Sequence, residues 1–155
     1  MRRVIHSVSP RSRYRVHLAD RPSSERALEA FVLALGGRAK DDAARPTAFV
    51  FEEDADLRAL ILGFFESRSW NVVTPETSGA AEQVCPALVV VDVRSSTSPG
   101  FHVLERILDS APGLPVVVIA SFGDTEVMAR AQSLGVRKVI EKPFGIEELE
   151  SAIAM

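Results

Sequence analysis

The chain has 155 residues, of which 46% are hydrophobic and 25% are charged, as in an ordinary globular protein. This length allows one domain with a continuous hydrophobic core and an extension, and excludes two full domains. The apolar runs have strand length, well below the roughly 18 residues that cross a bilayer, and the N-terminus lacks the apolar stretch of a secretory signal. The single cysteine, Cys85, excludes an intrachain disulfide and a cysteine-rich zinc site. We therefore expect a compact cytoplasmic protein with no membrane partner.

The charge is divided unevenly along the chain. Residues 1–46 carry ten Lys and Arg against five Asp and Glu, whereas residues 47–155 carry eight against sixteen. A basic arm of this kind either binds nucleic acid or an acidic partner, or is a solvated linker. No basic run exceeds two residues and few aromatic residues are interleaved, which favours the linker. The absence of a helix-turn-helix pattern also argues against nucleic acid as a partner.

Residues 1–46 nevertheless contain the pattern of one β-α unit. Alternating apolar residues predict a strand over Tyr14–Ala19, and apolar residues at helical spacing predict a helix over Ser24–Leu35. The stretch Gly37–Pro46 is typical of a linker. Shifted by 33 positions, this unit overlays the β-α unit that follows it, so a duplication and a chance likeness both remain open.

From Thr47 onward, short β-type runs alternate with helix-type segments, which predicts parallel strands joined by right-handed crossover helices. The strand segments are rich in Val, Ile and Phe, and three are almost continuously apolar, as strands covered on both faces should be. The expected strands are Ala48–Phe51, Asn71–Thr74, Leu88–Val91, Val116–Ala120 and Val136–Ile140. We therefore expect one α/β domain over residues 47–155.

Apolar residues at helical spacing predict the helices between these strands. The first should begin at Asp54, a suitable N-cap, and the fourth should end at Gly135. The second, near Ser78–Val84, has the least definite pattern, and Ile146–Ile153 supplies the fifth. The core-facing residues are expected to be Leu57, Leu60, Ile61, Phe64 and Phe65 in the first helix, Phe101, Leu104, Ile107 and Leu108 in the third, and Val127, Ala131 and Leu134 in the fourth.

Charged residues follow three of the predicted strands, at the sheet edge where α/β proteins bind ligands. Glu52 and Glu53 follow the first strand, Asp92 the third and Lys142 the fifth. Carboxylates gathered in one cleft repel unless a cation neutralises them, and Mg²⁺ suits carboxylates together with a phosphate. Lys142 would add a point positive charge for an anion. This combination indicates phosphoryl transfer to a carboxylate, with Asp92 as the nucleophile.

Four segments resemble the receiver domains of response regulators in two-component systems. They are FVFEEDADLR from Phe49, LVVVDVRSSTSPGF from Leu88, PVVVIASFGDTE from Pro115 and GVRKVIEKPFGIEEL from Gly135. The resemblance covers residues 47–155 in unbroken order and says nothing about residues 1–46. It implies a flavodoxin-like doubly wound five-stranded parallel sheet of order 2-1-3-4-5, here with an N-terminal β-α extension. It also implies a signalling module rather than an enzyme.

The resemblance also implies roles for single residues. Asp92 would accept a phosphoryl group from a histidine kinase or phosphotransfer protein, and Lys142 would contact that group. Mg²⁺ would be bound by Glu53 and Asp92 of the acidic pocket, which also holds Glu52, and by the backbone carbonyl of Arg94. Each residue taken singly also fits an ordinary role, such as a loop cap or a first-turn acid of a helix. Taken together in sheet order, they favour the phosphoacceptor pocket.

The sequence departs from the family pattern at positions that concern switching. Glu52 and Glu53 replace two aspartates, and each is one methylene longer. Ala120 replaces a residue with a hydroxyl, and Val139 replaces an aromatic residue. Two functions therefore stay open: a phosphorelay receiver, or a phosphorylation-independent pseudo-receiver that acts as a binding or dimerisation module. A homodimer is an expected arrangement in the second case.

Overall fold

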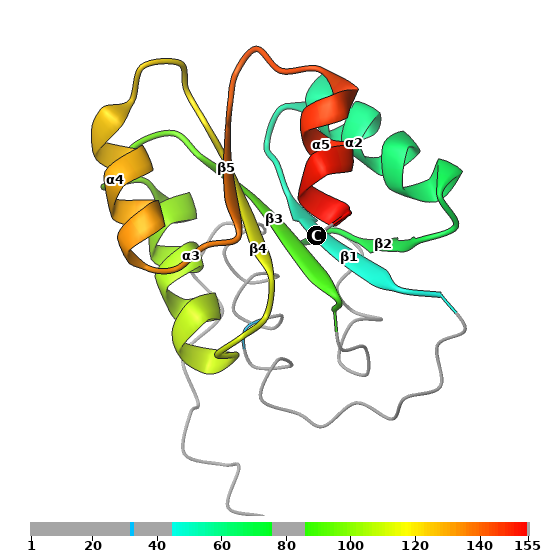
Figure 1. The fold of residues 1–155 in the computed structure, drawn as a ribbon, viewed down its shortest axis with the longest axis horizontal. Coiled ribbons are helices and arrows are strands. Elements are labelled where there is room, and N and C mark those ends of the chain that lie inside the picture. Colours follow the sequence, from blue (N-terminus) through cyan, green and yellow to red (C-terminus); the bar gives the residue numbers. More distant parts are fainter. Residues whose placement is uncertain (1–31, 33–44, 76–85, 155) are drawn as a thin grey trace, which may run out of the picture.

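The computed structural model of the chain describes Val32, residues 45–75 and residues 86–154. A five-stranded parallel sheet lies at the centre, in the order β2-β1-β3-β4-β5 (Figure 1). The strands are β1 (Thr47–Phe51), β2 (Asn71–Val73), β3 (Leu88–Val93), β4 (Val116–Ala120) and β5 (Lys138–Glu141). This is the doubly wound, flavodoxin-like order that the resemblance implied. The direction of the strand order reverses between β1 and β3, because the connection from β2 passes over β1 to reach β3.

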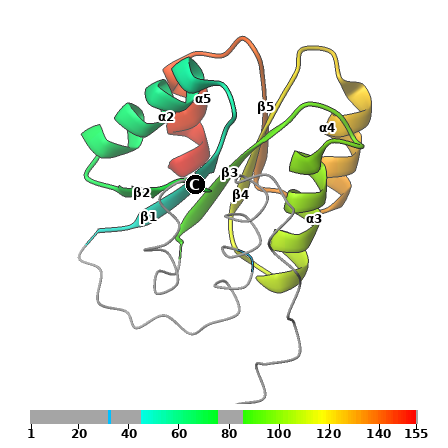
Figure 2. The same cartoon turned by 180° about the vertical axis from the view of Figure 1, so that it is seen from behind.

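Helices cover both faces of the sheet. One face carries α2 (Ala55–Ser67) and α5 (Ile146–Ile153), and the other carries α3 (Pro99–Ser110) and α4 (Thr125–Ser133), as the front and back views show (Figures 1 and 2). Within the described ranges, no helix combines the length and the apolar character that crossing a bilayer demands.

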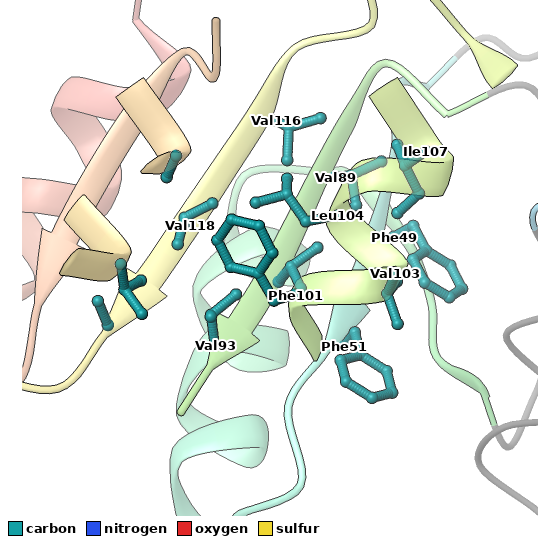
Figure 3. Packing of buried hydrophobic residues seen from close by; sticks show 14 of the residues in the cluster. Phe49, Phe51, Val89, Val93, Phe101, Val103, Leu104, Ile107, Val116 and Val118 are labelled. Carbon is teal, nitrogen blue, oxygen red and sulfur yellow. The ribbon is translucent and has the colours of Figure 1, made fainter. Parts of the chain in front are cut away.

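Alternation along the strands builds a separate core on each face. In β3, Val89, Val91 and Val93 face α3 and α4, whereas Leu88 and Val90 face α2 and α5. Figure 3 shows how α3 packs on the first of these faces, where Phe101 and other α3 side chains lie against strand residues. The labelled α3 residues are Phe101, Val103, Leu104 and Ile107, and their strand neighbours are Phe49, Phe51, Val89, Val93, Val116 and Val118. Each fully buried large side chain of this kind stabilises the fold by roughly 1.5–3 kcal/mol.

The ends of two helices confirm the predicted caps. The side chain of Asp54 accepts a hydrogen bond from the backbone N–H of Leu57 at 2.9 Å, which caps α2. At the end of α4, Gly135 has a φ of +79°, and its N–H donates to the carbonyl of Gln132. The N–H of Val136 donates to the carbonyl of Ala131, which completes a Schellman motif.

Several predicted details were wrong. Val136 does not open β5, because its N–H closes helix α4, and the strand begins only at Lys138. Strand β3 runs on to Val93, so the expected end at Val91 was too early. Leu60 does not face the core, since it is 51% exposed, and Leu134 is also largely exposed.

Two predicted elements lie outside the described residues. These are the strand Tyr14–Ala19 of the N-terminal extension and the helix near Ser78–Val84. The helix Ser24–Leu35 of the same extension also lies outside, except for Val32, which has helical geometry. Val32 is 5% exposed and belongs to the core cluster on the α3 and α4 face.

Candidate functional site

The predicted site residues come together at the carboxyl edge of the sheet. Glu52 follows β1 directly, Asp92 is the fifth residue of β3, and Lys142 follows β5 directly. In each strand, these residues are in phase with the side chains that face α2 and α5, such as Val50, Val90 and Ile140. Parallel pairing and a common phase therefore direct all three charged groups to the same side of the sheet.

Asp92 and Lys142 form the closest contact in this pocket. The Lys142 Nζ lies 2.8 Å from Oδ1 of Asp92, whose residue is only 5% exposed. The same Nζ lies 3.4 Å from Oε2 of Glu52. Partial burial alone would lower the pKa of Lys142, but the hydrogen bond and charge of Asp92, together with Glu52, outweigh burial and raise it. Lys142 is therefore a fixed positive charge between two carboxylates.

Glu52 is the most deeply buried acid of the pocket. Its side chain is fully buried; Oε1 accepts the backbone N–H of Asp54 at 2.9 Å. Its other oxygen, Oε2, has no hydrogen-bond partner among the described residues. Burial raises the pKa of the Glu52 carboxyl, and the charge of Asp92 adds to this, while the Asp54 N–H and Lys142 oppose it. The pocket thus contains a buried carboxylate oxygen whose ion-pair partner is the Lys142 Nζ at 3.4 Å.

Arg94 brings a second positive charge to the opposite side of Asp92. Its Nη2 lies 2.9 Å from Oε2 of Glu53, and its Nε lies 3.8 Å from Oδ2 of Asp92. From the sequence, Arg94 is expected to contribute only its backbone carbonyl, whereas in the structure its side chain is also part of the pocket. The signal was present, because Arg94 lies two residues after Asp92 and side chains two apart in a strand share a face.

The loop after β3 is held close to the backbone of Asp92. A Cβ built on Gly100 would lie 2.3 Å from the carbonyl oxygen of Asp92, so only glycine fits without movement. The Ser98 hydroxyl donates to the carbonyl of Ser95 at 2.7 Å, within the same loop. This contact gives a physical reason for the glycine eight residues after Asp92.

The two positions expected to lack switching groups lie on the other face of the sheet. Ala120 is fully buried in the cluster that faces α3 and α4, and it pairs with Val93 in β3. Val139 is partly buried against the same cluster, and it pairs with Val118. Neither side chain can donate or accept a hydrogen bond. The side chains of these positions therefore point to the sheet face opposite to that of the pocket side chains, although the Ala120 carbonyl accepts the backbone N–H of Lys142 at 2.9 Å.

The donor set suits a hard divalent cation in its chemistry. Carboxylate oxygens of Glu52, Glu53 and Asp92 are the ligand type that Mg²⁺ prefers, and Oε2 of Glu52 is ion-paired with Lys142 at 3.4 Å. In the described part of the chain, however, no three acidic, histidine or cysteine side chains are arranged as a metal cage. The reason is visible in the contacts, since Glu53 is turned toward Arg94.

Comparison with known proteins identifies the class to which this fold and pocket belong. The profile of the response regulator receiver domain matches residues 48–154, and the chain belongs to this family. Receiver domains are signalling modules that generally bind Mg²⁺ at the phosphorylation site.

Two curated relatives and one solved structure illustrate the likeness. The chain is 27% identical to the nitrogen assimilation regulatory protein NtrX of Azorhizobium caulinodans, over 64% of this chain and 23% of NtrX. It is 28% identical to the C4-dicarboxylate transport transcriptional regulatory protein DctD of Rhizobium meliloti, over 68% of this chain and 24% of DctD. The match thus spans about a quarter of each relative. A response regulator receiver domain protein from Clostridium thermocellum shares the fold, with a TM-score of 0.61, 18% identity, and coverage of 70% of this chain and 91% of that chain.

Proposed function

We propose that this chain is a phosphorelay receiver in which Asp92 accepts a phosphoryl group from a histidine kinase or phosphotransfer protein of the cytoplasm. The observation that carries the proposal is the position of Asp92. It lies at the carboxyl edge of the sheet, with Lys142 at 2.8 Å on one side and Arg94 on the other. A carboxylate held between cations can receive an anionic group that it would otherwise repel.

The proposed reaction uses the pocket residues directly. A carboxylate oxygen of Asp92 forms a bond to phosphorus while the bond between phosphorus and the donor's histidine nitrogen breaks. Lys142 stays charged, because its pKa is raised, and it can pair with an oxygen of the transferred group. Glu52, Glu53, Asp92 and the Arg94 carbonyl would hold Mg²⁺, which when bound neutralises charge on the phosphoryl oxygens.

Exposed apolar side chains near the same edge support a protein partner. Phe122, which is 81% exposed, follows β4, and Ile146 begins α5 after β5. Apolar side chains exposed around a charged pocket are typical of a contact surface. A donor protein bound there would bring its phosphohistidine to Asp92.

The experiment is phosphorylation from a small donor. Incubation with Mg²⁺ and acetyl phosphate should add one phosphoryl group, detected by intact mass, and Asp92→Asn should abolish the addition. The matched control is Asp109→Asn, an exposed aspartate near the end of α3, which should leave the addition unchanged. Labelling that persists in Asp92→Asn, or no labelling of the parent chain, would contradict the proposal.

A second candidate is a pseudo-receiver that binds or dimerises without responding to phosphate. The favouring observation is the burial of Ala120 in an apolar cluster, where it offers no hydroxyl to a group on Asp92. A group on Asp92 shifts a conformational equilibrium only through contacts that differ between the two states. Beryllofluoride should then perturb amide resonances near Asp92 and leave those of α4 and β5 unchanged. Large shifts on α4 would favour the switching receiver instead.

A further inference from the structure

The acidic pocket already contains two cations, and they divide its carboxylates between them. Lys142 lies on the side of Glu52 and Oδ1 of Asp92. Arg94 lies on the side of Glu53 and Oδ2 of Asp92. The carboxylates of Glu52, Glu53 and Asp92 thus face two permanent positive charges. Arg94 is the cation that pairs with Glu53. Glu53 and Asp92, which face Arg94, are both among the residues that would hold the metal of the proposed function.

We propose that Arg94 is a resident counter-cation that competes with a divalent metal ion for Glu53 and Asp92. The inference rests on the proposed function, because it concerns the metal that this function uses. Its central observation is the 2.9 Å contact between the Arg94 guanidinium and the Glu53 carboxylate, with Asp92 on the same guanidinium. In this state the Arg94 guanidinium neutralises part of the negative charge of the pocket without metal. Metal binding displaces the guanidinium from the two carboxylates.

Charge repulsion opposes simultaneous binding of the two cations. Mg²⁺ binds carboxylate oxygens at about 2.0–2.1 Å. An ion on Oε2 of Glu53 would lie within about 5 Å of the Arg94 Nη2, which is 2.9 Å from the same oxygen, and like charges this close repel. Binding of the ion therefore favours a position of the guanidinium away from Glu53.

The Arg94 side chain is able to make this movement. It is 63% exposed, and its 3.8 Å approach to Asp92 is longer than a hydrogen bond. Exposed ion pairs of this kind are weak. Competition should therefore weaken metal binding by a moderate factor, roughly three- to fivefold, rather than abolish it.

The test measures Mg²⁺ affinity without any phosphoryl transfer. Parent chain and Arg94→Met are titrated with MgCl₂ at constant ionic strength, and the amide shifts of Glu53 and Asp92 give the dissociation constants. Met has similar length but no charge. We expect Arg94→Met to bind Mg²⁺ roughly three- to fivefold more tightly than the parent chain.

A matched variant separates this local effect from the loss of net charge. Arg137→Met removes the same charge at the opposite edge of the sheet, where the Arg137 N–H pairs with the first residue of β4. Its Mg²⁺ affinity should stay within about twofold of the parent value. Arg94→Gln, with an uncharged polar side chain, provides a second variant and should behave as Arg94→Met does.

Equal Mg²⁺ affinities of the parent chain and both Arg94 variants would overturn the inference, as would a lack of Mg²⁺ binding in all of them. An equal gain in Arg137→Met would reduce the effect to net charge and overturn it too. These failures differ from failure of the proposed function. A chain that is phosphorylated at Asp92 but shows equal affinities keeps the function and loses the competition.

Discussion

Among single residues, Glu52 should make the free energy of unfolding of the domain fall as the pH rises. Burial raises the pKa of the Glu52 carboxyl above 4.5, its ordinary value, and the neighbouring Asp92 adds to the rise. The folded state therefore favours the protonated form. This stabilising contribution is fully present below the unfolded pKa and is lost as the pH rises through the folded pKa. Ionised Glu52 consequently lowers the free energy of unfolding at neutral pH.

Glu52→Gln should remove the cost of burying an ionised carboxylate, because the Gln side chain is uncharged. It also keeps an oxygen that accepts the Asp54 N–H. We expect a higher free energy of unfolding than the parent chain at neutral pH, with a difference that shrinks as the pH falls. Urea unfolding in EDTA between about pH 4.5 and 8 measures it. Glu66→Gln, on the exposed side of α2, is the control and should show no such trend. A loss of stability at neutral pH would mean that the Lys142 ion pair outweighs burial.

Gly100 permits a second prediction at this scale. A Cβ at this position would overlap the backbone carbonyl of Asp92 at 2.3 Å, and backbone cannot yield as a flexible side chain can. Gly100→Ala should therefore lower the free energy of unfolding by about 1–3 kcal/mol, as overpacking does. Gly63 lies within α2 with nothing within 4 Å of a built Cβ, so Gly63→Ala should instead stabilise by roughly 0.5–1 kcal/mol. Thermal unfolding of both variants gives the comparison, and equal effects would contradict it.

Among the helices, α4 contacts α3 and the loop after β3 through Arg130. Arg130 donates to the carbonyl of Ser96 and to the carboxylate of Glu105, each at 3.0 Å, and its guanidinium lies 4.1 Å from the ring centre of Phe101. The Ser96 hydroxyl donates to Glu126 in the first turn of α4 at 2.5 Å. These contacts connect the loop after β3 to helix α4.

Arg130→Ala should lower the free energy of unfolding by about 1–2 kcal/mol, because it removes two hydrogen bonds and a cation–π contact that are partly exposed. Arg130→Lys keeps the charge and loses the planar fork, so it should recover only part of the loss. A double-mutant cycle with Glu105→Gln should give a coupling of roughly 0.5 kcal/mol. Urea unfolding of the parent chain, the three single variants and the double variant gives these differences. Full recovery by Lys would show that charge alone is responsible.

Most elements could be predicted from the sequence because their signals are local. Continuous apolar runs marked the strands, and the Asp54 cap marked the start of α2. The errors arose where tertiary context decides. Val136 is apolar and β-branched, yet its N–H is used to close α4. Leu60 fits the helical period, but the sheet reaches only part of the α2 surface, so Leu60 stays exposed.

At the scale of the whole molecule, the pocket was partly predictable because parallel strands share one carboxyl edge. That rule alone brings Glu52, Asp92 and Lys142 together, and the structure places them in contact. The shared edge does not tell which charged side chains pair with each other, because pairing depends on the rotamer of each side chain and on its neighbours in other strands and loops. The pairing of Arg94 with Glu53 is of this kind, and so is the contact of Ser96 with Glu126, thirty residues away.

The last prediction concerns the attachment of residues 1–46 to the receiver domain. Val32 is buried in the core cluster that contains Phe49 and Phe101, although it precedes the matched family region. Val32→Ala should therefore lower the free energy of unfolding by about 2 kcal/mol, the cost of removing buried methyl groups. Arg45→Ala, an exposed position in the same segment, should change it by less than about 0.5 kcal/mol. Removal of residues 1–44 should cost at least as much as Val32→Ala, since it removes the same contacts. Urea unfolding compares the three variants, and an unchanged midpoint for both Val32→Ala and the deletion would show that the core of the receiver is complete without this segment.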